Sequence, residues 1–143
     1  MINSTAFNYV DVLTKAADAS WTRESVINNN IANVSTVGYK RQDIDFQSVL
    51  REELGNCKHK SLDNKINELD ISDLNAQIYT DSANYSYRLD GNNVDIDTEN
   101  VELASEQIRY DALVTSINSE FSRMRAALGK YYRRIRNGTF SSI

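Results

Sequence analysis

One stretch decides how this 143-residue chain folds: Asn30-Ile31-Ala32-Asn33-Val34-Ser35-Thr36-Val37-Gly38-Tyr39-Lys40-Arg41. From Ser4, a candidate helix N-cap, to Asn33 the chain contains neither glycine nor proline, which predicts one long helix that ends inside this stretch. Either Asn33 or Gly38 can adopt the left-handed conformation that ends a helix. Gly38 is the stronger candidate for a positive φ, because Thr36 and Val37 are β-branched and resist it.

The predicted N-terminal helix carries a narrow apolar line at coiled-coil spacing. Its positions are Val10, Leu13, Ala17, Ser20, Glu24, Ile27, Ile31 and Val34. Ser20 and Glu24 interrupt the line in its middle. Ordering a residue costs about 1–2 kcal/mol of backbone entropy, whereas burying a Leu or Ile contributes roughly 1.5–3 kcal/mol. A helix with so few apolar positions needs partners, either in an ordinary helix bundle or in an assembly.

A second long helix is predicted near the C-terminus, with Asp97 or Thr98 as its cap and Glu99 and Glu102 in its first turn. One apolar face is marked by Val101, Ala104, Ile108 and Ala112. A second line runs through Tyr110, Leu113, Ile117, Phe121, Met124, Leu128, Tyr131 and Ile135. The helix ends at Gly129 or at Asn137-Gly138, so it exceeds about 30 residues, or roughly 45 Å. Such length predicts coiled-coil packing.

The middle of the chain is acidic, since residues 43–100 carry 13 Asp and Glu against 5 Lys and Arg. A short extended piece is expected within 41–50, a loop over 51–75, and one or two strands over 77–89 that include Ile78. Asp90-Gly91-Asn92 predicts a turn. The predicted fold is mainly α, with long terminal helices pairing as a coiled-coil-like bundle. The predicted regions are 1–50, a variable middle over 51–97, and 98–143.

At the junction the sequence resembles a known family. Ala32-Asn33-Val34-Ser35-Thr36-Val37-Gly38-Tyr39-Lys40 is similar to the pattern A-N-x-x-T-x-G-aromatic-K, which is shared by the axial proteins of the bacterial flagellum. Asp43-Ile44-Asp45-Phe46 and the block from Asp90 to Glu99 look like the proximal rod protein of that family. The likeness covers residues 8–50 and 88–128. Many rod proteins have Pro where Val37 stands, so the turn here relies on Gly38 alone.

The resemblance implies a structural subunit of the basal-body rod that self-assembles into a tubular helical array and transmits torque. Its partners would be copies of itself, other rod and basal-body proteins, and the flagellar type III export apparatus, through which it leaves the cytoplasm uncleaved. The rod motif comprises Asn30, Asn33, Thr36, Gly38, Tyr39 and Lys40. The predicted helix-packing interface comprises Val10, Leu13, Ile27, Ile31, Val101, Ile108, Leu113, Ile117, Phe121, Met124 and Leu128.

The residues offer little chemistry, so we expect no catalytic residues, metal or cofactor. A single cysteine, Cys57, makes no internal disulfide, and its neighbour His59 in a lysine-rich segment is a poor nucleophilic pair with it. Zinc ligands at defined spacing are absent, and with Gly91 at the sixth loop position Ser86 and Arg88 would stand where a calcium loop needs carboxylates.

The stretch 130–136 mixes cations with aromatic side chains, as surfaces that contact nucleic acid or a membrane can. It fits a solvated helix end or an acidic surface on a neighbouring subunit, whereas the net charge of −4 argues against a nucleic-acid binder. We expect no small-molecule substrate. No apolar run approaches the ~20 residues that cross a membrane, and no cleavable signal peptide is expected. The alternative function is a soluble helical binding module, such as a secretion chaperone or adaptor.

Overall fold

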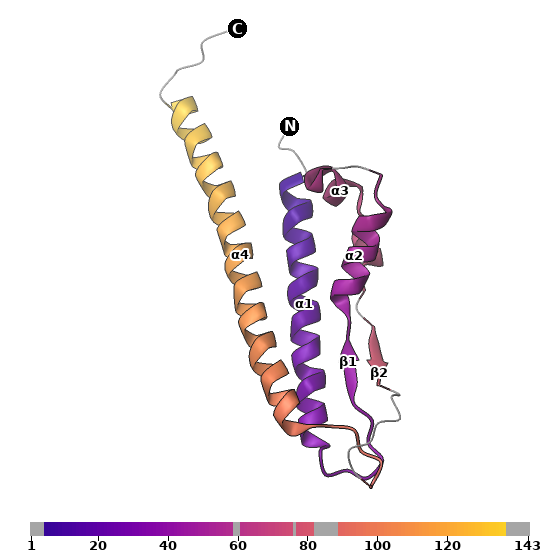
Figure 1. Ribbon diagram of the computed structural model, residues 1–143. Coiled ribbons are helices and arrows are strands. Elements are labelled where there is room, and N and C mark those ends of the chain that lie inside the picture. The colour runs from indigo at the N-terminus through magenta and orange to yellow at the C-terminus, as the bar shows by residue number, and fades with distance from the viewer. Residues whose placement is uncertain (1–4, 59–60, 76, 82–88, 137–143) are drawn as a thin grey trace.

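The computed structural model describes residues 5–58, 61–75, 77–81 and 89–136. Its elements, in chain order, are α1 (Thr5–Ala32), β1 (Gln42–Ile44), α2 (Phe46–Asn56), α3 (Leu62–Glu68), the 3-10 turn η1 (Ile71–Asp73), β2 (Ile78–Thr80) and α4 (Ile96–Arg136). The predicted fold class is confirmed: two long terminal helices lie side by side and antiparallel, with a small two-stranded sheet between them in sequence (Figure 1).

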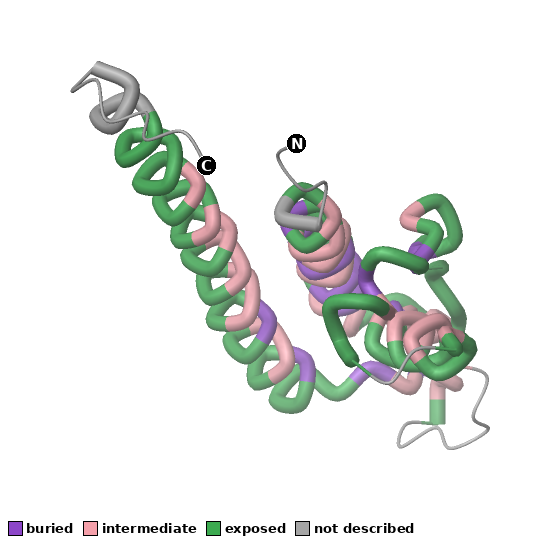
Figure 2. The backbone as a smooth tube through the Cα atoms, turned by 90° about the horizontal axis from the view of Figure 1, so that it is seen from above, coloured by how far each residue is buried: buried purple, intermediate pink, exposed green. Residues whose placement is uncertain are grey.

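The helix α1 forms the centre of the molecule. On one side it packs along α4, and on the other it packs against β1, α3 and η1 (Figure 1). With 41 residues α4 is longer than the 28-residue α1, and it diverges from α1 towards its own C-terminal end. Seen from above, α4 turns its partly buried residues towards α1 and leaves its outer face exposed (Figure 2). The two helices therefore form a hairpin that is closed at one end and open at the other.

The sheet is antiparallel, with Gln42 opposite Thr80 and Ile44 opposite Ile78. The predicted strand at Ile78 is confirmed, while residues 82–88 of the stretch predicted to hold one or two strands lie outside the described residues. The extended piece expected within 41–50 covers only residues 42–44. From Phe46 the chain is helical, because the Asp45 carboxylate accepts a hydrogen bond from the Ser48 N–H and caps α2.

The loop expected over 51–75 is wrong, since most of this stretch lies in α2, α3 and η1. Ser61 caps α3 by accepting from the Asn64 N–H, and Asp70 caps η1 by accepting from the Ser72 N–H. The elements α3 and η1 are too short to show a period, because they span seven and three residues. The buried apolar side chains of this stretch are Ile66, Leu69 and Leu74.

The cap of the C-terminal helix lies two or three residues before the predicted caps, Asp97 and Thr98. Asp95 makes the capping contacts: its carboxylate accepts from the Asp97 N–H at 3.1 Å and from the Thr98 hydroxyl at 3.0 Å. Asp97 and Thr98 therefore lie inside the first turn of α4. The helix passes through Gly129 and continues to Arg136, the longer of the two predicted ends. Ser4, the predicted cap of α1, lies outside the described residues.

The apolar core is small and lies mainly on the sheet side of α1. Its members include Val26, Ile27, Ile44, Leu74 and Val94. Several of the most deeply buried side chains are instead polar, namely Asn30, Asn92, Glu99 and Glu106. Among the described helices, none combines the length and the apolar character needed to span a membrane.

Candidate functional site

The two stretches that carry the family resemblance meet at the closed end of the hairpin. Gly38 has a φ of +71°, as predicted, and its N–H donates to the carbonyl oxygen of Asp90 at 3.0 Å. Lys40 donates through Nζ to the Gly91 carbonyl at 2.8 Å, and the Arg41 N–H donates to Asn93 Oδ1 at 2.7 Å. We call residues 30–41 together with 90–94 the polar joint.

Asn92 is the central side chain of the polar joint on the 90–94 side. Its Nδ2 amide donates to the carbonyl oxygens of Asn33, Val34 and Thr36 at 3.0, 3.1 and 2.8 Å. Its Oδ1 accepts from the Val94 N–H at 2.8 Å, and the side chain is fully buried. Carbonyls just beyond a helix end lack intrahelical partners. Asn92 therefore caps the end of α1 from a segment almost 60 residues away.

Asn30 makes the corresponding contacts from the α1 side. Its Nδ2 donates to the Gln42 carbonyl at 2.7 Å and to Glu99 Oε2 at 2.9 Å. Its Oδ1 accepts from the Gln42 N–H at 3.0 Å and from the Tyr39 hydroxyl at 3.2 Å. This one buried side chain joins α1, β1 and α4. Asn33 acts locally, donating to the Asn29 carbonyl at 2.8 Å and accepting from the Thr36 hydroxyl at 3.1 Å.

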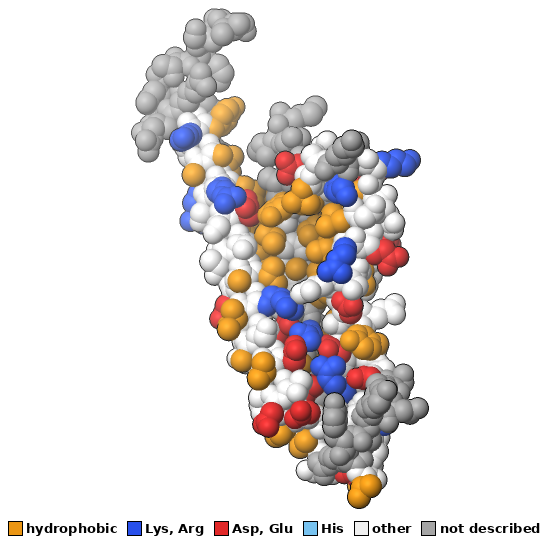
Figure 3. Space-filling model, viewed as in Figure 1, with side chains coloured by type: hydrophobic (Ala, Val, Ile, Leu, Met, Phe, Trp, Pro, Cys, Tyr) orange, Lys and Arg blue, Asp and Glu red, His pale blue; other side chains and the backbone are white. Residues whose placement is uncertain are grey.

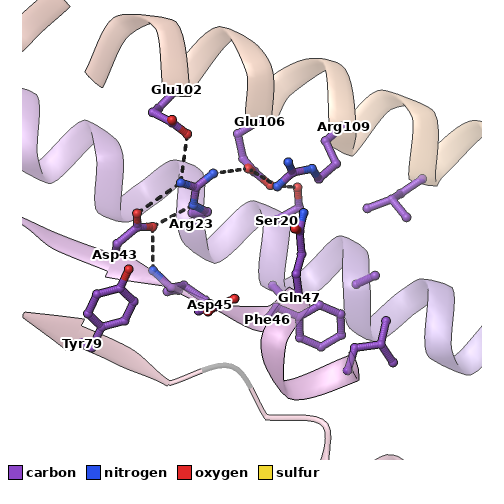
Figure 4. A pocket seen from close by; sticks show the side chains of 15 residues that line it. Ser20, Arg23, Asp43, Asp45, Phe46, Gln47, Tyr79, Glu102, Glu106 and Arg109 are labelled. Atoms are coloured by element: carbon purple, nitrogen blue, oxygen red, sulfur yellow. Dashed lines mark hydrogen bonds and ion pairs between the residues drawn. The ribbon is translucent and has the colours of Figure 1, made fainter. Parts of the chain in front are cut away.

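Next to the polar joint, six charged side chains form an ion cluster, and Figure 4 shows four of them, Arg23, Asp43, Glu102 and Glu106. Its members are Arg23 of α1, Arg41 and Asp43 at β1, and Glu99, Glu102 and Glu106 of α4. Arg23 is its centre. It contacts Asp43 through Nε at 2.7 Å, Glu106 through Nη1 at 2.8 Å and Glu102 through Nη2 at 2.9 Å.

The remaining contacts extend the cluster in both directions along α4. Arg41 binds Asp43 through Nη2 at 2.9 Å and pairs with Glu99 through Nε. Glu106 also accepts from the Ser20 hydroxyl and from Arg109 Nη1. Among the described residues, every buried side-chain nitrogen or oxygen atom has a hydrogen-bond partner. A fully satisfied buried polar network specifies one arrangement of its elements.

The electrostatics of the ion cluster favour the charged forms. Burial alone would raise the pKa of Asp43, but hydrogen bonds from Arg23 and the Ile44 N–H, together with the charges of Arg23 and Arg41, lower it below its ordinary value. The hydrogen bond to Asp43 raises the pKa of Arg23. The pKa of Arg41 is also raised, because its pairing with Glu99 and Asp43 outweighs burial. Arg23, Arg41 and Asp43 are therefore each held in the charged form by their partners.

Sequence reasoning missed this cluster because it explained Glu99 and Glu102 by the helix dipole, did not consider Glu106, and regarded Ser20 as an interruption of the apolar line. A signal was available in the spacing. Positions 99, 102 and 106 continue through 113, 117 and 124 at intervals of three, four and seven, so they share the face of α4 that carries Leu113 and Ile117. The packing face of α4 is thus acidic in its first half and apolar in its second.

The predicted helix-packing residues fall into two groups. Val10 and Ile27 are buried, and Leu13, Ile31, Leu113, Ile117 and Met124 are half-buried between the elements of the chain. In contrast, Val101 and Ile108 are 70% and 72% exposed, on the outer face of α4, and Phe121 and Leu128 are also exposed. In the single chain these four do not pack against α1, so their role in an interface stays a prediction about neighbouring subunits.

A groove of about 420 Å³ opens beside the ion cluster, between α1, α2 and α4. Its apolar lining includes Ala16, Ala19, Phe46, Leu50 and Leu113. Figure 3 shows hydrophobic side chains gathered in this hollow between α4 and α2. A second hollow adjoins it along α2 and is lined by Leu50, Arg51, Leu54 and Lys65, among others. Together they form one open surface, which we call the helix groove.

Where the structure describes them, the residues considered for nucleophilic, metal or charged-surface chemistry do not come together in one site. The Cys57 thiol is half-buried and donates to the Glu53 carbonyl at 3.3 Å, whereas His59 lies outside the described residues. Within the described part of the chain, no three His, Cys, Asp or Glu side chains gather as a metal site. Lys130 and Tyr131 of the basic stretch are exposed on α4, and the side chains of 132–136 lie outside the description.

The chain is similar to known proteins in the regions that build the polar joint. The sequence profile of the family described as flagella basal body rod protein matches residues 11–40. The flagellar basal body rod protein FlgB of Bacillus subtilis is 38% identical over 106 residues, which cover 74% of this chain and 81% of that protein. FlgB of Proteus mirabilis is 33% identical, covering 74% and 82%, and FlgB of Borrelia hermsii is 33% identical, covering 80% and 84%.

Proposed function

Since this chain belongs to the FlgB family of flagellar basal body rod proteins, we propose that its α1–α4 hairpin is a stiff unit that assembles into a tubular helical array and transmits torque. The chain is a structural subunit of the basal-body rod. Its relatives are named as rod proteins, which favours this function over a soluble binding module or an enzyme. Its partners are copies of itself and other rod components of the basal body.

The observation that carries the proposal is that the two ends of the hairpin differ in polarity and burial. At the closed end, the polar joint and the ion cluster bury polar groups and hold α4 on α1. Along the outer face and the open end, large apolar side chains such as Val101, Ile108 and Phe121 stay exposed. Contiguous exposed apolar surface on a soluble chain marks a contact with another protein. A heterologous contact that does not close generates a helical array.

Torque transmission requires a subunit that keeps its shape under a lateral load. Hydrogen bonds and ion pairs are directional, so displacing α4 along α1 would misalign Glu102 and Glu106, the two α4 carboxylates that Arg23 holds. Apolar contacts lose less when two surfaces slide. The placement of the directional contacts inside the subunit therefore supports a rigid hairpin rather than a hinge.

The proposal extends to the route by which the chain reaches the rod. It leaves the cytoplasm through the flagellar type III export apparatus, without removal of an N-terminal segment, and is incorporated into the basal body. The mass of the chain in purified basal bodies tests this: the intact 16.2 kDa is expected, and a shorter mature chain contradicts export without cleavage.

The function is tested by deleting the gene in a motile host that carries this chain. Loss of swimming, together with basal bodies that lack a rod, is expected. A tagged copy of the chain should restore both and should copurify with basal bodies. A matched Gly55→Ala variant should restore them equally, because Gly55 lies on α2 with no atom within 4 Å of an added Cβ. A deletion strain that swims and builds complete rods would contradict the proposal.

A further inference from the structure

In the first half of α4 the buried face is acidic and the outer face is apolar. Its buried face carries Glu99 and Glu106, whereas its outer face carries Val101 and Ile108, both more than two-thirds exposed. A helix whose outer face meets water normally carries polar side chains on that face and apolar side chains on its buried face. Ala104 continues the apolar face, and we call Val101, Ala104 and Ile108 the outer stripe. The outer face of α4 points away from α1, so none of the described elements of the chain covers the stripe (Figure 2).

Acidic side chains accompany the outer stripe. Asp97 and Asp111 are exposed on α4, and both lie on the same side of the helix as Val101 and Ile108 at 3.6 residues per turn. Asp97 is one turn before Val101, and Asp111 is one turn after Ile108. The stripe is therefore an apolar strip about 10 Å long that is bounded by two carboxylates.

The helix groove has the complementary character. Its lining combines apolar side chains with polar and charged ones, and the small side chains of Ala16 and Ala19 on α1 allow another helix to approach closely. Most of its acids belong to the ion cluster at one end, where Arg23 engages Asp43, Glu102 and Glu106. Along α2 and at the α4 edge the groove carries cations instead.

These cations are Arg51, Lys65 and Arg109. An apolar surface with cationic edges fits an apolar stripe with carboxylate ends, because opposite charges across an interface favour the correct partner and register. The stripe cannot enter the groove of its own chain, since Arg109 and Leu113 of the same rigid helix form one of the groove walls. The occupant must therefore come from another copy.

We propose that the outer stripe of α4 of one copy docks into the helix groove of the next copy. This inference rests on the proposed function, and it names the two faces through which copies of the chain meet. The contact is heterologous, so each linked pair of copies leaves one groove and one stripe free, and the contact propagates into an open array. A two-fold contact between two outer stripes is disfavoured, because it would bring the carboxylates of Asp97 and Asp111 from both copies together.

Disulfide trapping tests the contact directly. The native thiol is removed by Cys57→Ser. Ile108→Cys then places a thiol on the outer stripe, and Gln47→Cys places one in the helix groove. Gln47 lines both hollows of that groove. A chain that carries both substitutions should form a ladder of linked oligomers on mild oxidation. Chains that carry one substitution each should give only a dimer, and only when mixed. The matched control pairs Ile108→Cys with Val37→Cys, which is equally exposed but lies in the polar joint, and should link weakly.

Charge reversal provides a second readout. Asp111→Lys should weaken self-association about fivefold, as expected for turning one attractive rim pair into a repulsive one. Adding Arg51→Glu to the same chain should recover most of the loss, as measured by sedimentation equilibrium. Three results would overturn the contact: linkage of Ile108→Cys to itself, linkage no stronger than in the Val37→Cys control, or an Asp111→Lys defect that Arg51→Glu leaves unchanged.

The trapping is also carried out in purified basal bodies, which separates this inference from the proposed function. If the chain is present there and motility depends on it, but Ile108→Cys and Gln47→Cys do not link, the docking is wrong and the rod function stands. If the purified chain forms the ladder but is absent from basal bodies, the contact between copies is correct and the rod function is wrong.

Discussion

The closed and open ends of the α1–α4 hairpin are held by different chemistry. At the closed end the contacts between the helices are polar and fully buried, as in the pairing of Asn30 with Glu99. Towards the open end the same face of α4 carries Leu113 and Ile117, which are only half-buried. The geometry of the subunit is therefore set by directional bonds, whereas its apolar surface is left for contacts with other molecules.

The difference also predicts how each end responds to substitution. Removing one member of a buried ion network leaves its partners buried without compensation, which costs about 3–5 kcal/mol. Truncating a half-buried leucine removes apolar contact that water already reaches in part, so it costs less than the 2–5 kcal/mol of a core site. The closed end should be sensitive in the isolated chain, and the open end should be sensitive mainly in the assembly.

Arg23→Met should have the largest effect on the closed end. It leaves the carboxylates of Asp43, Glu102 and Glu106 without their shared cation, and the free energy of unfolding should fall by about 3 kcal/mol in urea titrations followed by circular dichroism. The matched control is Arg123→Met, whose exposed pair with Glu120 should contribute under about 0.5 kcal/mol. Equal losses in the two variants would remove the distinction between the ends.

Asn92→Ala should come next, because it removes the donor that three carbonyls at the end of α1 share. A loss of about 2 kcal/mol is expected, because the substitution breaks these part-buried hydrogen bonds and leaves the buried Val94 N–H without the Asn92 acceptor, although the Asn33 and Thr36 carbonyls keep backbone donors. Amide exchange in the last turn of α1 should accelerate with it. Asn67→Ala, which breaks one exposed contact to Asn8, serves as the comparison and should change little. If Asn92→Ala loses little free energy of unfolding, the end of α1 is stable without its distant cap.

Gly38→Val should have a smaller effect that comes from the backbone alone. Nothing lies within 4 Å of an added Cβ, but the φ of +71° costs an L-residue roughly 1–2 kcal/mol, and a β-branched one resists it most. Gly55→Val, in a helix without positive φ, is the control. Motility should suffer more from the Gly38 variant than from the Gly55 variant. Equal swimming in both would sink the assignment of a strained turn.

The pH dependence of the free energy of unfolding should be the smallest effect, because it arises only in acid. Because the pKa of Asp43 is lowered in the folded chain, its contribution is fully present above the unfolded aspartate value of about 3.9 and is lost as pH falls through the lower folded value. Unfolding measured between pH 7 and pH 3 should therefore show stability falling below about pH 4. Asp43→Asn should start less stable and lose less with acid. Parallel curves for the two chains would contradict this assignment.

Prediction from sequence worked where local rules were sufficient. The absence of glycine and proline predicted α1, and the β-branched neighbours of Gly38 identified it as the residue with positive φ. It failed where a residue's role depends on a distant partner. Glu99 and Glu102 were explained by the helix dipole alone, because no nearby residue in the sequence shows that Arg41 and Arg23 from other elements pair with them.

The middle of the chain failed for a related reason. Residues 51–75 lack a hydrophobic period because their helices are short, and a seven-residue helix that buries only Ile66 leaves no repeating pattern to detect. The caps Ser61 and Asp70 were visible, but such residues are also common in loops. Packing on α1 decides between the two, and that packing is tertiary.

By itself, the amino-acid sequence determined the two long helices, the glycine turns at 38 and 91 and the family resemblance, because each depends on residues within a few positions of one another. Only the tertiary structure decided which face of α4 is buried. An amphipathic helix can turn either its acidic or its apolar side inwards, and the choice depends on what stands opposite. Here Arg23, Arg41 and Asn30 stand opposite Glu99, Glu102 and Glu106, so the charged side faces in and the outer stripe faces out.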